Sequence, residues 1–218
     1  MHHFSSDDQG YYPYARLVFD SAGNLYGTTY DGEINPGEVL GYGTVFELTP
    51  MVGGSWNFKL VHKFNNDGKD GCNPYAGLLL DDAGNLYGTT YFGGAGGGTV
   101  FQLRPNLDGS WAEKLLHKFK GMPDGTLPRA GVIFDAAGNL YGTTVAGGNA
   151  DVGAVFELMP GAGGSWTEKI LHKFQNNGED GDGPFAGVIL DAGGDLYGTT
   201  FAGGAHNGGT AFEIIPKP

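Results

Sequence analysis

The chain has 218 residues, 42 of them glycine, and a formal net charge of −12 at pH 7. This acidity argues against a DNA-binding or RNA-binding protein, because phosphate binding requires clustered lysine and arginine. No apolar run approaches the roughly 20 residues that cross a bilayer. The first residues also lack the basic and apolar segments of a signal peptide. The sequence therefore predicts no membrane span and shows no signal peptide.

One unit is repeated four times along the chain. The pentapeptide Leu-Tyr-Gly-Thr-Thr begins at Leu25, Leu86, Leu140 and Leu196, and other landmarks recur in step with it. A repeat of this length in a glycine-rich sequence is typical of a propeller or another repeat array. We expect a single domain, 1–218, with units near 5–64, 65–119, 120–174, and 175–218 together with 1–4.

The second unit shows the expected strands in chain order. Residues 76–81 form a short apolar run, and the turn that follows contains asparagine, aspartate and glycine, which favour tight turns. Residues 86–91 are aromatic and β-branched, a composition typical of a strand. After a glycine-rich loop, residues 99–103 form a third strand. Residues 111–119 alternate apolar and polar side chains and form a fourth.

Four strands joined by short connections predict an antiparallel meander, and its repetition predicts an all-β propeller of four four-stranded blades. Residues 1–4 align with 171–174, the end of a fourth strand, and the chain stops just after a third strand. We therefore expect the N-terminal strand to close the ring by completing the last blade. The alternative is a homodimer in which two chains form one eight-bladed ring.

The motifs of the unit also resemble a known family. Asp-Gly-x-x-Pro, Gly-Asn-Leu-Tyr-Gly-Thr-Thr and Gly-Thr-Val-Phe-Glu-Leu, as in 124–128, 84–90 and 43–48, are similar to the tandem repeats called GloVer. The resemblance covers essentially the whole chain and implies an extracellular or surface-anchored bacterial protein. This chain shows only four units and no visible anchor. The family carries no established activity, so the resemblance leaves the chemistry open.

In a meander blade, the loops between blades and the loops between the second and third strands emerge on one face. We expect this loop-rich face to hold the functional residues, because the loops there vary between the units. The residue after the proline of Asp-Gly-x-x-Pro differs in each unit: Tyr14, Tyr75, Arg129 and Phe185. Aromatic rings there would stack on a sugar, and Arg129 would bind a carboxylate or hydroxyls. Packing between the blades is the alternative for these side chains.

Several acidic side chains also fall on the loop-rich face. Glu33 and Glu38 lie in the longest of the loops between second and third strands, which forms one wall in our interpretation. The aspartates of the Asp-Gly-x-x-Pro motif cap a turn, or they bind Ca²⁺, a cation that takes oxygen ligands. The candidate ligands are Asp70, Asp124, Asp180 and Asp182. No other cofactor is expected.

The repeated histidines His62, His117 and His172 lie on the outer strands, about three strand spacings of roughly 4.8 Å from the inner strand. Because they diverge from one another, we expect packing with a hydrogen bond rather than a shared metal ion. The repeated tryptophans are interpreted as wedges between blades.

The sequence contains no nucleophile motif, zinc pattern, P-loop or dinucleotide fingerprint. We therefore expect a non-catalytic extracellular module that binds carbohydrate or a protein ligand through the loop-rich face. One alternative is a polysaccharide hydrolase or lyase that uses carboxylates of this face with Arg129. Another is a purely structural surface repeat.

Overall fold

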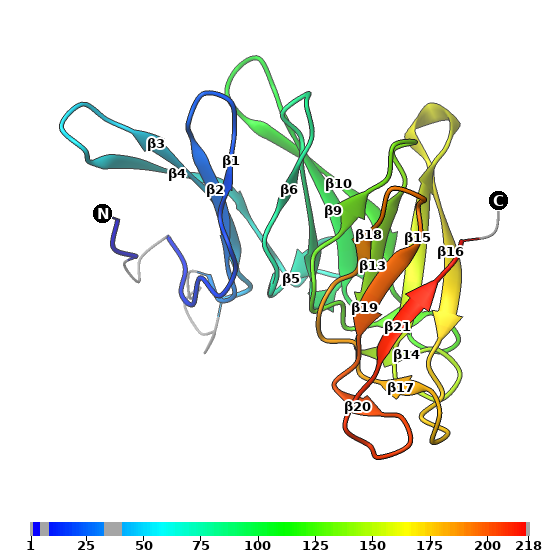
Figure 1. The fold of residues 1–218 in the computed structure, drawn as a ribbon. Helices are drawn as coiled ribbons and strands as arrows, with labels where there is room; N and C mark the ends of the chain where they lie inside the picture. The colour runs from blue at the N-terminus through cyan, green and yellow to red at the C-terminus, as the bar shows by residue number, and fades with distance from the viewer. Residues whose placement is uncertain (1, 5–8, 33–40, 217–218) are drawn as a thin grey trace.

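The computed structural model describes residues 2–4, 9–32 and 41–216, and this part of the chain contains β-strands, one short 3-10 helix (Ala162–Gly164) and no α-helix. The prediction of an all-β fold is confirmed. Each unit forms one antiparallel sheet, and the sheets follow one another in chain order (Figure 1). In the described residues, the first three sheets have four strands and the fourth has three.

The bounds of the strands repeat from unit to unit. The main sheets are β1 (Val18–Phe19), β2 (Leu25–Thr29), β3 (Thr44–Pro50) and β4 (Trp56–Lys63); β6 (Leu79–Leu80), β7 (Leu86–Thr90), β9 (Thr99–Pro105) and β10 (Trp111–Lys118); β12 (Ile133–Phe134), β13 (Leu140–Thr144), β15 (Ala154–Pro160) and β16 (Trp166–Lys173); and β18 (Ile189–Leu190), β19 (Leu196–Thr199) and β21 (Ala211–Ile214).

Three small two-stranded sheets connect the loop between units to the loop after the second strand. They are β5 (Gly71–Cys72) with β8 (Phe92–Gly93), β11 (Gly125–Thr126) with β14 (Ala146–Gly147), and β17 (Gly181–Asp182) with β20 (Ala202–Gly203). In Figure 1, β14, β17 and β20 lie at the lower side of the molecule, and β5 lies at the lower end of the second unit. This pairing confirms that the two kinds of loop share one face, which we call the loop-rich face.

The inner strands are shorter than the sequence predicts, with two paired residues each. The residues before them run close to the backbone of the preceding unit. A Cβ on Gly77 would lie 2.8 Å from the carbonyl oxygen of Arg16, and one on Gly131 would lie 3.0 Å from that of Gly77. A cavity of about 280 Å³ is lined by inner segments of all four units, including Arg16, Gly187 and Val188. The inner segments of the four units therefore approach one another closely around this cavity.

The core within each unit depends on the glycine of Leu-Tyr-Gly-Thr-Thr. A Cβ on Gly88 would lie 2.5 Å from the ring of Phe101, which is fully buried in the third strand. The ring therefore fills the space that a side chain on the second strand would occupy. Between units, Phe119 at the end of one fourth strand packs on Phe156 of the next unit, with ring centroids 5.1 Å apart.

Hydrogen bonds repeat at the contacts between consecutive units, which we call joints. The hydroxyl of Thr89 donates to the carbonyl oxygen of Ala130 in the next unit at 2.9 Å, and Thr28 and Thr143 make the equivalent bonds at 3.0 Å. Trp111 acts as an expected wedge, since it packs edge-on against Tyr26 of the preceding unit. Each unit is thus held mainly by its sequence neighbours.

The N-terminal segment packs on the first sheet, but its described residues do not pair with the last one. Phe4 packs on Phe46 with centroids 5.0 Å apart, as Phe119 packs on Phe156, and His2 stacks on Phe58 at 4.9 Å. It therefore lies on the first sheet as the end of a preceding fourth strand would. In the described residues, however, β21 pairs only with β19, and it lies on the opposite side of Figure 1 from the N-terminal segment. The described N-terminal residues therefore form no strand pair with β21.

No helix in the described part of the chain has the length and apolarity that a membrane crossing requires.

Candidate functional site

Four residues that share one repeat position form a continuous stack. The rings of Tyr14 and Tyr75 are stacked with centroids 5.2 Å apart. The guanidinium of Arg129 lies 4.6 Å from the centroid of the Tyr75 ring and 4.7 Å from that of the Phe185 ring. We call Tyr14, Tyr75, Arg129 and Phe185 the aromatic ladder. The sequence analysis interpreted these four side chains as ligand-binding or as packing between units, and the structure shows them packed on one another across the units.

The backbone before each ladder residue is held in an unusual conformation. The residue that precedes the motif proline has a left-handed φ in every unit: 59° at Tyr12, 58° at Asn73, 60° at Leu127 and 63° at Gly183. This conformation is costly for a side chain such as leucine and persists only where the surroundings impose it. The N–H of Leu127 donates to the carbonyl oxygen of Gly97 in the preceding unit at 2.7 Å. The joints therefore fix the positions from which the ladder side chains extend.

A second row of aromatic residues lies beside the ladder and was not predicted. Tyr30 packs edge-on against Tyr75 at 5.3 Å, and Phe201 stacks on Phe185 at 5.0 Å. Each directly follows Leu-Tyr-Gly-Thr-Thr, so their shared repeat position was the available signal. Tyr12 stacks on Tyr14 at the other end of the ladder. Tyr12 is 54% exposed and Phe201 70% exposed.

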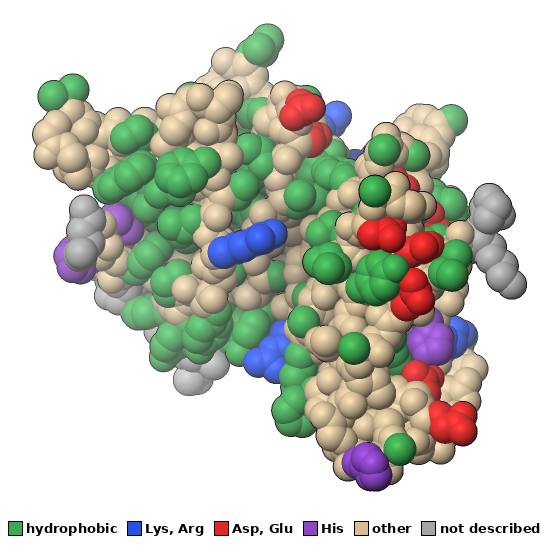
Figure 2. Space-filling view, viewed as in Figure 1, with side chains coloured by type: hydrophobic (Ala, Val, Ile, Leu, Met, Phe, Trp, Pro, Cys, Tyr) green, Lys and Arg blue, Asp and Glu red, His purple; other side chains and the backbone are tan. Residues whose placement is uncertain are grey.

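The aromatic surface has little charge of its own. Figure 2 shows hydrophobic side chains gathered over the N-terminal half of the molecule, beside a few basic ones, while acidic side chains gather over the C-terminal half. Arg129 donates a hydrogen bond to the hydroxyl of Tyr75 at 3.2 Å. Its described contacts are all to Tyr75 and Phe185, so no carboxylate of the described residues pairs with it. The guanidinium is stabilised by aromatic faces instead.

Glu33 and Glu38 were expected to line one wall of the loop-rich face. Both lie outside the described residues.

The motif aspartates cap turns, as one of the two sequence interpretations proposed. Asp70 accepts backbone hydrogen bonds from Asn65 at 2.9 Å and from Gly71 at 2.6 Å. Its Oδ2 also lies 3.3 Å from Nε2 of His62. His117 lies equally close to Asp124, and His172 lies 3.0 Å from Asp180. Each histidine therefore has the hydrogen bond that the sequence predicted, with a partner that the sequence did not predict.

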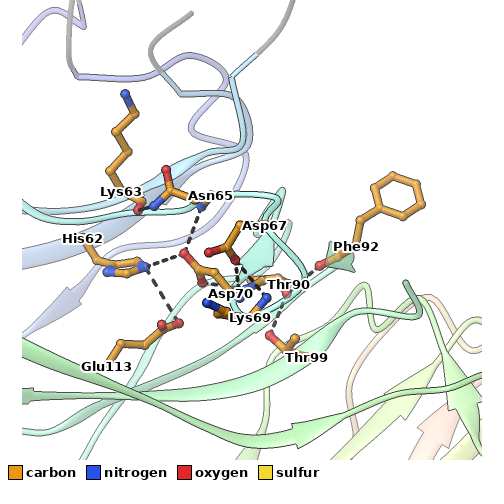
Figure 3. Close-up of polar contacts among 11 residues, drawn as sticks. His62, Lys63, Asn65, Asp67, Lys69, Asp70, Thr90, Phe92, Thr99 and Glu113 are labelled. Atoms are coloured by element: carbon orange, nitrogen blue, oxygen red, sulfur yellow. Dashed lines mark hydrogen bonds and ion pairs between the residues drawn. The ribbon is translucent and has the colours of Figure 1, made fainter. Parts of the chain in front are cut away.

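A glutamate from the following unit joins two of these pairs. Oε1 of Glu113, on β10, lies 3.8 Å from Nε2 of His62, and Figure 3 shows the three side chains converging. We call His62, Asp70 and Glu113 the first cluster. Oε1 of Glu168, on β16, lies 3.4 Å from Nε2 of His117. His117, Asp124 and Glu168 form the second cluster.

A β-bulge directs each histidine toward its cluster. In the pairing of β9 with β10, Phe101 faces Leu115 and Val100 faces His117, so Leu116 is an extra residue. The same extra residue precedes His62 and His172. Bulges re-aim the side chains beside them. Simple alternation along the fourth strand therefore could not predict where the histidines point.

The carboxyl groups of the clusters are electrostatically strained. Burial, together with the neighbouring carboxylate of Asp70, raises the pKa of Glu113 to about 8. Burial and Asp124 do the same for Glu168. Burial opposes ionisation of Asp124, yet hydrogen bonds, the largest from His117, lower the pKa of Asp124 below its usual value. The raised pKa values of Glu113 and Glu168 show that each cluster disfavours a second negative charge.

The remaining metal candidates are arranged differently. Among the described residues, no third ligand joins His172 and Asp180 to make a cluster. Asp182 accepts a hydrogen bond from the side chain of Asn176 at 2.9 Å. Asp70 and Asp124 belong to separate clusters, so the structure does not bring motif aspartates of different units around one cation.

Comparison with family models accounts for the repeats. The model described as the Gloeobacter/Verrucomicrobia repeat matches residues 1–113 and 96–218, so the two matches together span the chain. The chain belongs to this family. Each match to the Gloeobacter/Verrucomicrobia repeat covers about two of the four units, and the resemblance found in the sequence motifs is confirmed. A search of curated proteins gave no match.

The family match explains the scaffold better than the site. The motifs shared by all units supply the glycine, phenylalanine and threonine contacts of the joints. The ladder residues of this Gloeobacter/Verrucomicrobia repeat chain occupy one position of the motif but differ in kind, from tyrosine to arginine to phenylalanine. Any specificity of the loop-rich face therefore lies in these differences.

Proposed function

We propose that the chain is a non-catalytic binding module that takes a carbohydrate chain along the aromatic ladder. The observation that carries this proposal is the continuous stack of Tyr14, Tyr75, Arg129 and Phe185. A large exposed aromatic surface is typical of an interaction site, because soluble proteins otherwise bury such area.

The chemistry of the ladder suits a sugar polymer. The inner rings are stacked on one another, so we expect a sugar to meet their edges. The Tyr14 hydroxyl would bond to a sugar hydroxyl, and the Tyr75 hydroxyl, which accepts from Arg129, would donate to one. The outer rings, Tyr12 and Phe201, offer more open faces for the apolar face of a sugar ring. Because successive units contribute one residue each, a ligand with repeating chemistry matches the surface better than a compact one.

A hydrolase or lyase remains the second candidate, since the clusters contain paired carboxylates with raised pKa values. It is less well supported, because the described contacts of Arg129 include no carboxylate. A glycosidase needs two carboxyl groups flanking the scissile bond. In the clusters, the carboxyl groups lie in joints between units rather than in the ladder. A protein ligand and a purely structural role are the remaining alternatives.

A glycan array with the wild-type chain and two variants tests the proposal. Phe201→Ala removes an exposed ring of the ladder surface, and Ile215→Ala removes a side chain of similar exposure, 66%, elsewhere. We expect glycan binding that weakens about tenfold or more in Phe201→Ala, a loss of about 1.4 kcal/mol, and is unchanged in Ile215→Ala. Equal binding by both variants would contradict the role of the ladder. Release of reducing sugar or unsaturated product from the bound glycan would favour the enzyme.

We also propose that the four sheets are blades of a propeller, since inner segments of all four units line one cavity. Closure by the N-terminal strand requires a monomer near 22.8 kDa, whereas two chains sharing an eight-bladed ring require twice that mass. Light scattering separates these arrangements. An extracellular or surface location is proposed from the family resemblance and is tested by fractionating cells that produce the protein.

A further inference from the structure

The two clusters place metal-ligating atoms at the joints between units. His62 and Asp70 come from the end of the first unit and the loop that follows it, and Glu113 comes from the outer strand of the second unit (Figure 3). The second cluster repeats this arrangement one unit later. In each cluster, one nitrogen and two carboxylate oxygens lie within 4.8 Å of one another.

The glutamate oxygens that face the histidines lack a hydrogen bond. Oε1 of Glu113 and Oε1 of Glu168 are both buried from solvent and accept no hydrogen bond from a described residue. A buried carboxylate oxygen is costly unless a donor or a cation satisfies it. Lys118, whose charge favours the ionised form of Glu113, donates its hydrogen bond to the carbonyl oxygen of Gly68. Each cluster therefore combines two acids and one imidazole, and a cation among them would satisfy the buried glutamate oxygen.

We propose that each cluster binds one divalent first-row transition-metal ion, with Zn²⁺ as the representative probe. The ligands are His62 Nε2 with the carboxylates of Asp70 and Glu113, and their counterparts in the second cluster. Water completes the coordination. This inference does not depend on the proposed binding function, because it concerns the joints rather than the ladder.

The geometry and the donor set favour this class of metal. Ligands at about 2.1 Å from a tetrahedral metal ion lie roughly 3.4 Å apart. The distances from each histidine nitrogen to its carboxylates are 3.3 and 3.8 Å in the first cluster and 3.3 and 3.4 Å in the second. An imidazole ligand suits Zn²⁺ and its neighbours, whereas Ca²⁺ takes oxygen ligands. The backbone N–H groups of Asn65 and Gly71 orient the Asp70 carboxylate, as supporting hydrogen bonds do in metal sites.

The repeats differ in whether they supply the third ligand of a cluster. At the repeat position of Glu113 and Glu168, the first unit has Phe58, and His2 stacks on that ring. His172 and Asp180 form a pair to which no described residue adds a third ligand. The pattern therefore predicts two metal ions per chain rather than one for every histidine.

A bound ion would connect consecutive units, because its ligands come from both sides of a joint. A ligand that binds only the folded state raises the melting temperature by mass action. Zn²⁺ should therefore stabilise the wild-type protein, and this stabilisation should be lost when both glutamates are replaced.

The decisive measurement is the stoichiometry of Zn²⁺ after removal of metals with a chelator. We expect two tightly bound ions in equilibrium dialysis of the wild type, one in Glu113→Gln and one in Glu168→Gln, and none in the double variant. All proteins carry His2→Ala and His3→Ala to remove a histidine pair outside the clusters. Asp180→Asn is the matched control and should retain two ions. No tight binding by the wild type, or two ions in the double variant, would overturn the proposal.

A second measurement does not depend on the folding of a variant. Crystals of the wild type grown with Zn²⁺ should show an anomalous-scattering peak between His62 and Glu113 and another between His117 and Glu168. Peaks only at other surface histidines would refute the assignment. Absence of a peak at one of the two joints would refute the site at that joint.

Discussion

Replacing Glu113 and Glu168 with glutamine should make the stability of the metal-free protein less dependent on pH. Burial, with the adjacent aspartate, raises the pKa of each glutamate to about 8, against an ordinary value of 4.5. Between these values the folded state binds more protons than the unfolded state. The stabilising contribution of the protonated carboxyl is fully present below the unfolded pKa and is lost as pH rises through the folded pKa.

The magnitude follows from proton linkage. One proton of difference changes the free energy of unfolding by about 1.4 kcal/mol per pH unit. Two such carboxyls give an upper limit of about 3 kcal/mol per pH unit in the window between the two pKa values, and solvent screening of these partly exposed groups makes the measured slope smaller. Lys118 and Lys173 favour the ionised glutamates, so the pKa values lie lower than burial and the aspartates alone would place them. A domain has only about 5–15 kcal/mol of stability in total, so the effect is readily measured.

The assay is urea unfolding followed by tryptophan fluorescence, in chelator, at intervals from about pH 5 to about pH 8. The useful quantity is the difference in the free energy of unfolding between the wild type and the double variant, because titrations that both proteins share cancel in it. We expect this difference to fall as pH rises. Glu179→Gln, an exposed glutamate in a loop, is the control and should follow the wild type. Parallel curves for wild type and double variant would show that the clusters do not hold strained carboxyls.

Three further predictions concern the scaffold and the ladder. Gly98→Ala should lower the free energy of unfolding by about 3 kcal/mol or more, because the new Cβ would lie 2.4 Å from a carbonyl oxygen. Gly138→Ala, with a similar φ and open space around it, should lower it by only about 1 kcal/mol. Equal losses for the two variants in urea unfolding would contradict the close contact at Gly98. Thr89→Val should cost about 1 kcal/mol by the same assay, because it leaves a carbonyl of the next unit without its donor. Arg129→Met should lower the free energy of unfolding by about 1–2 kcal/mol, because it removes contacts with two rings and a hydroxyl. Arg104→Met, at an exposed strand position, should leave it nearly unchanged. Similar losses for the two variants would refute the stacking of Arg129 between the rings.

The repeat period was enough to predict the strands and the shared face of the loops. The period was also enough to predict that the ladder residues lie near one another, because residues at one repeat position, such as Tyr14 and Tyr75, must lie at equivalent places in neighbouring units. Their mode of contact was not predictable. Whether Arg129 would contact a carboxylate or lie between rings depends on distances across a joint, which the local pattern of either unit does not contain.

The clusters show a second limit of the sequence pattern. His62, Asp70 and Glu113 occupy three different repeat positions, and the period alone does not say which positions meet across a joint. The bulge before each histidine also changes the direction of its side chain, and alternation within the strand gives no sign of it. The sequence therefore identified the aspartates and histidines separately but missed their association with a glutamate of the next unit.

Closure of the ring was the other expectation that local patterns could not decide. The alignment of residues 1–4 with the end of a fourth strand did not specify a partner for Phe4, which the structure places against Phe46. Pairing with β21 depends instead on the sum of the small rotations from each unit to the next. A modest change in that rotation separates a closed ring from an open one, and no single residue encodes it.

The contacts between neighbours, such as the hydroxyl of Thr89 with the carbonyl of Ala130, have a consequence for how such a protein changes during evolution. The second and third units each carry the donor for the next unit and the acceptor for the previous one. Duplication of one unit within the gene would therefore preserve every joint and add one residue to the ladder. Under the proposed function, the length of ligand that the ladder spans would grow in steps of one unit, and the residue at each added ladder position would set the chemistry of that step.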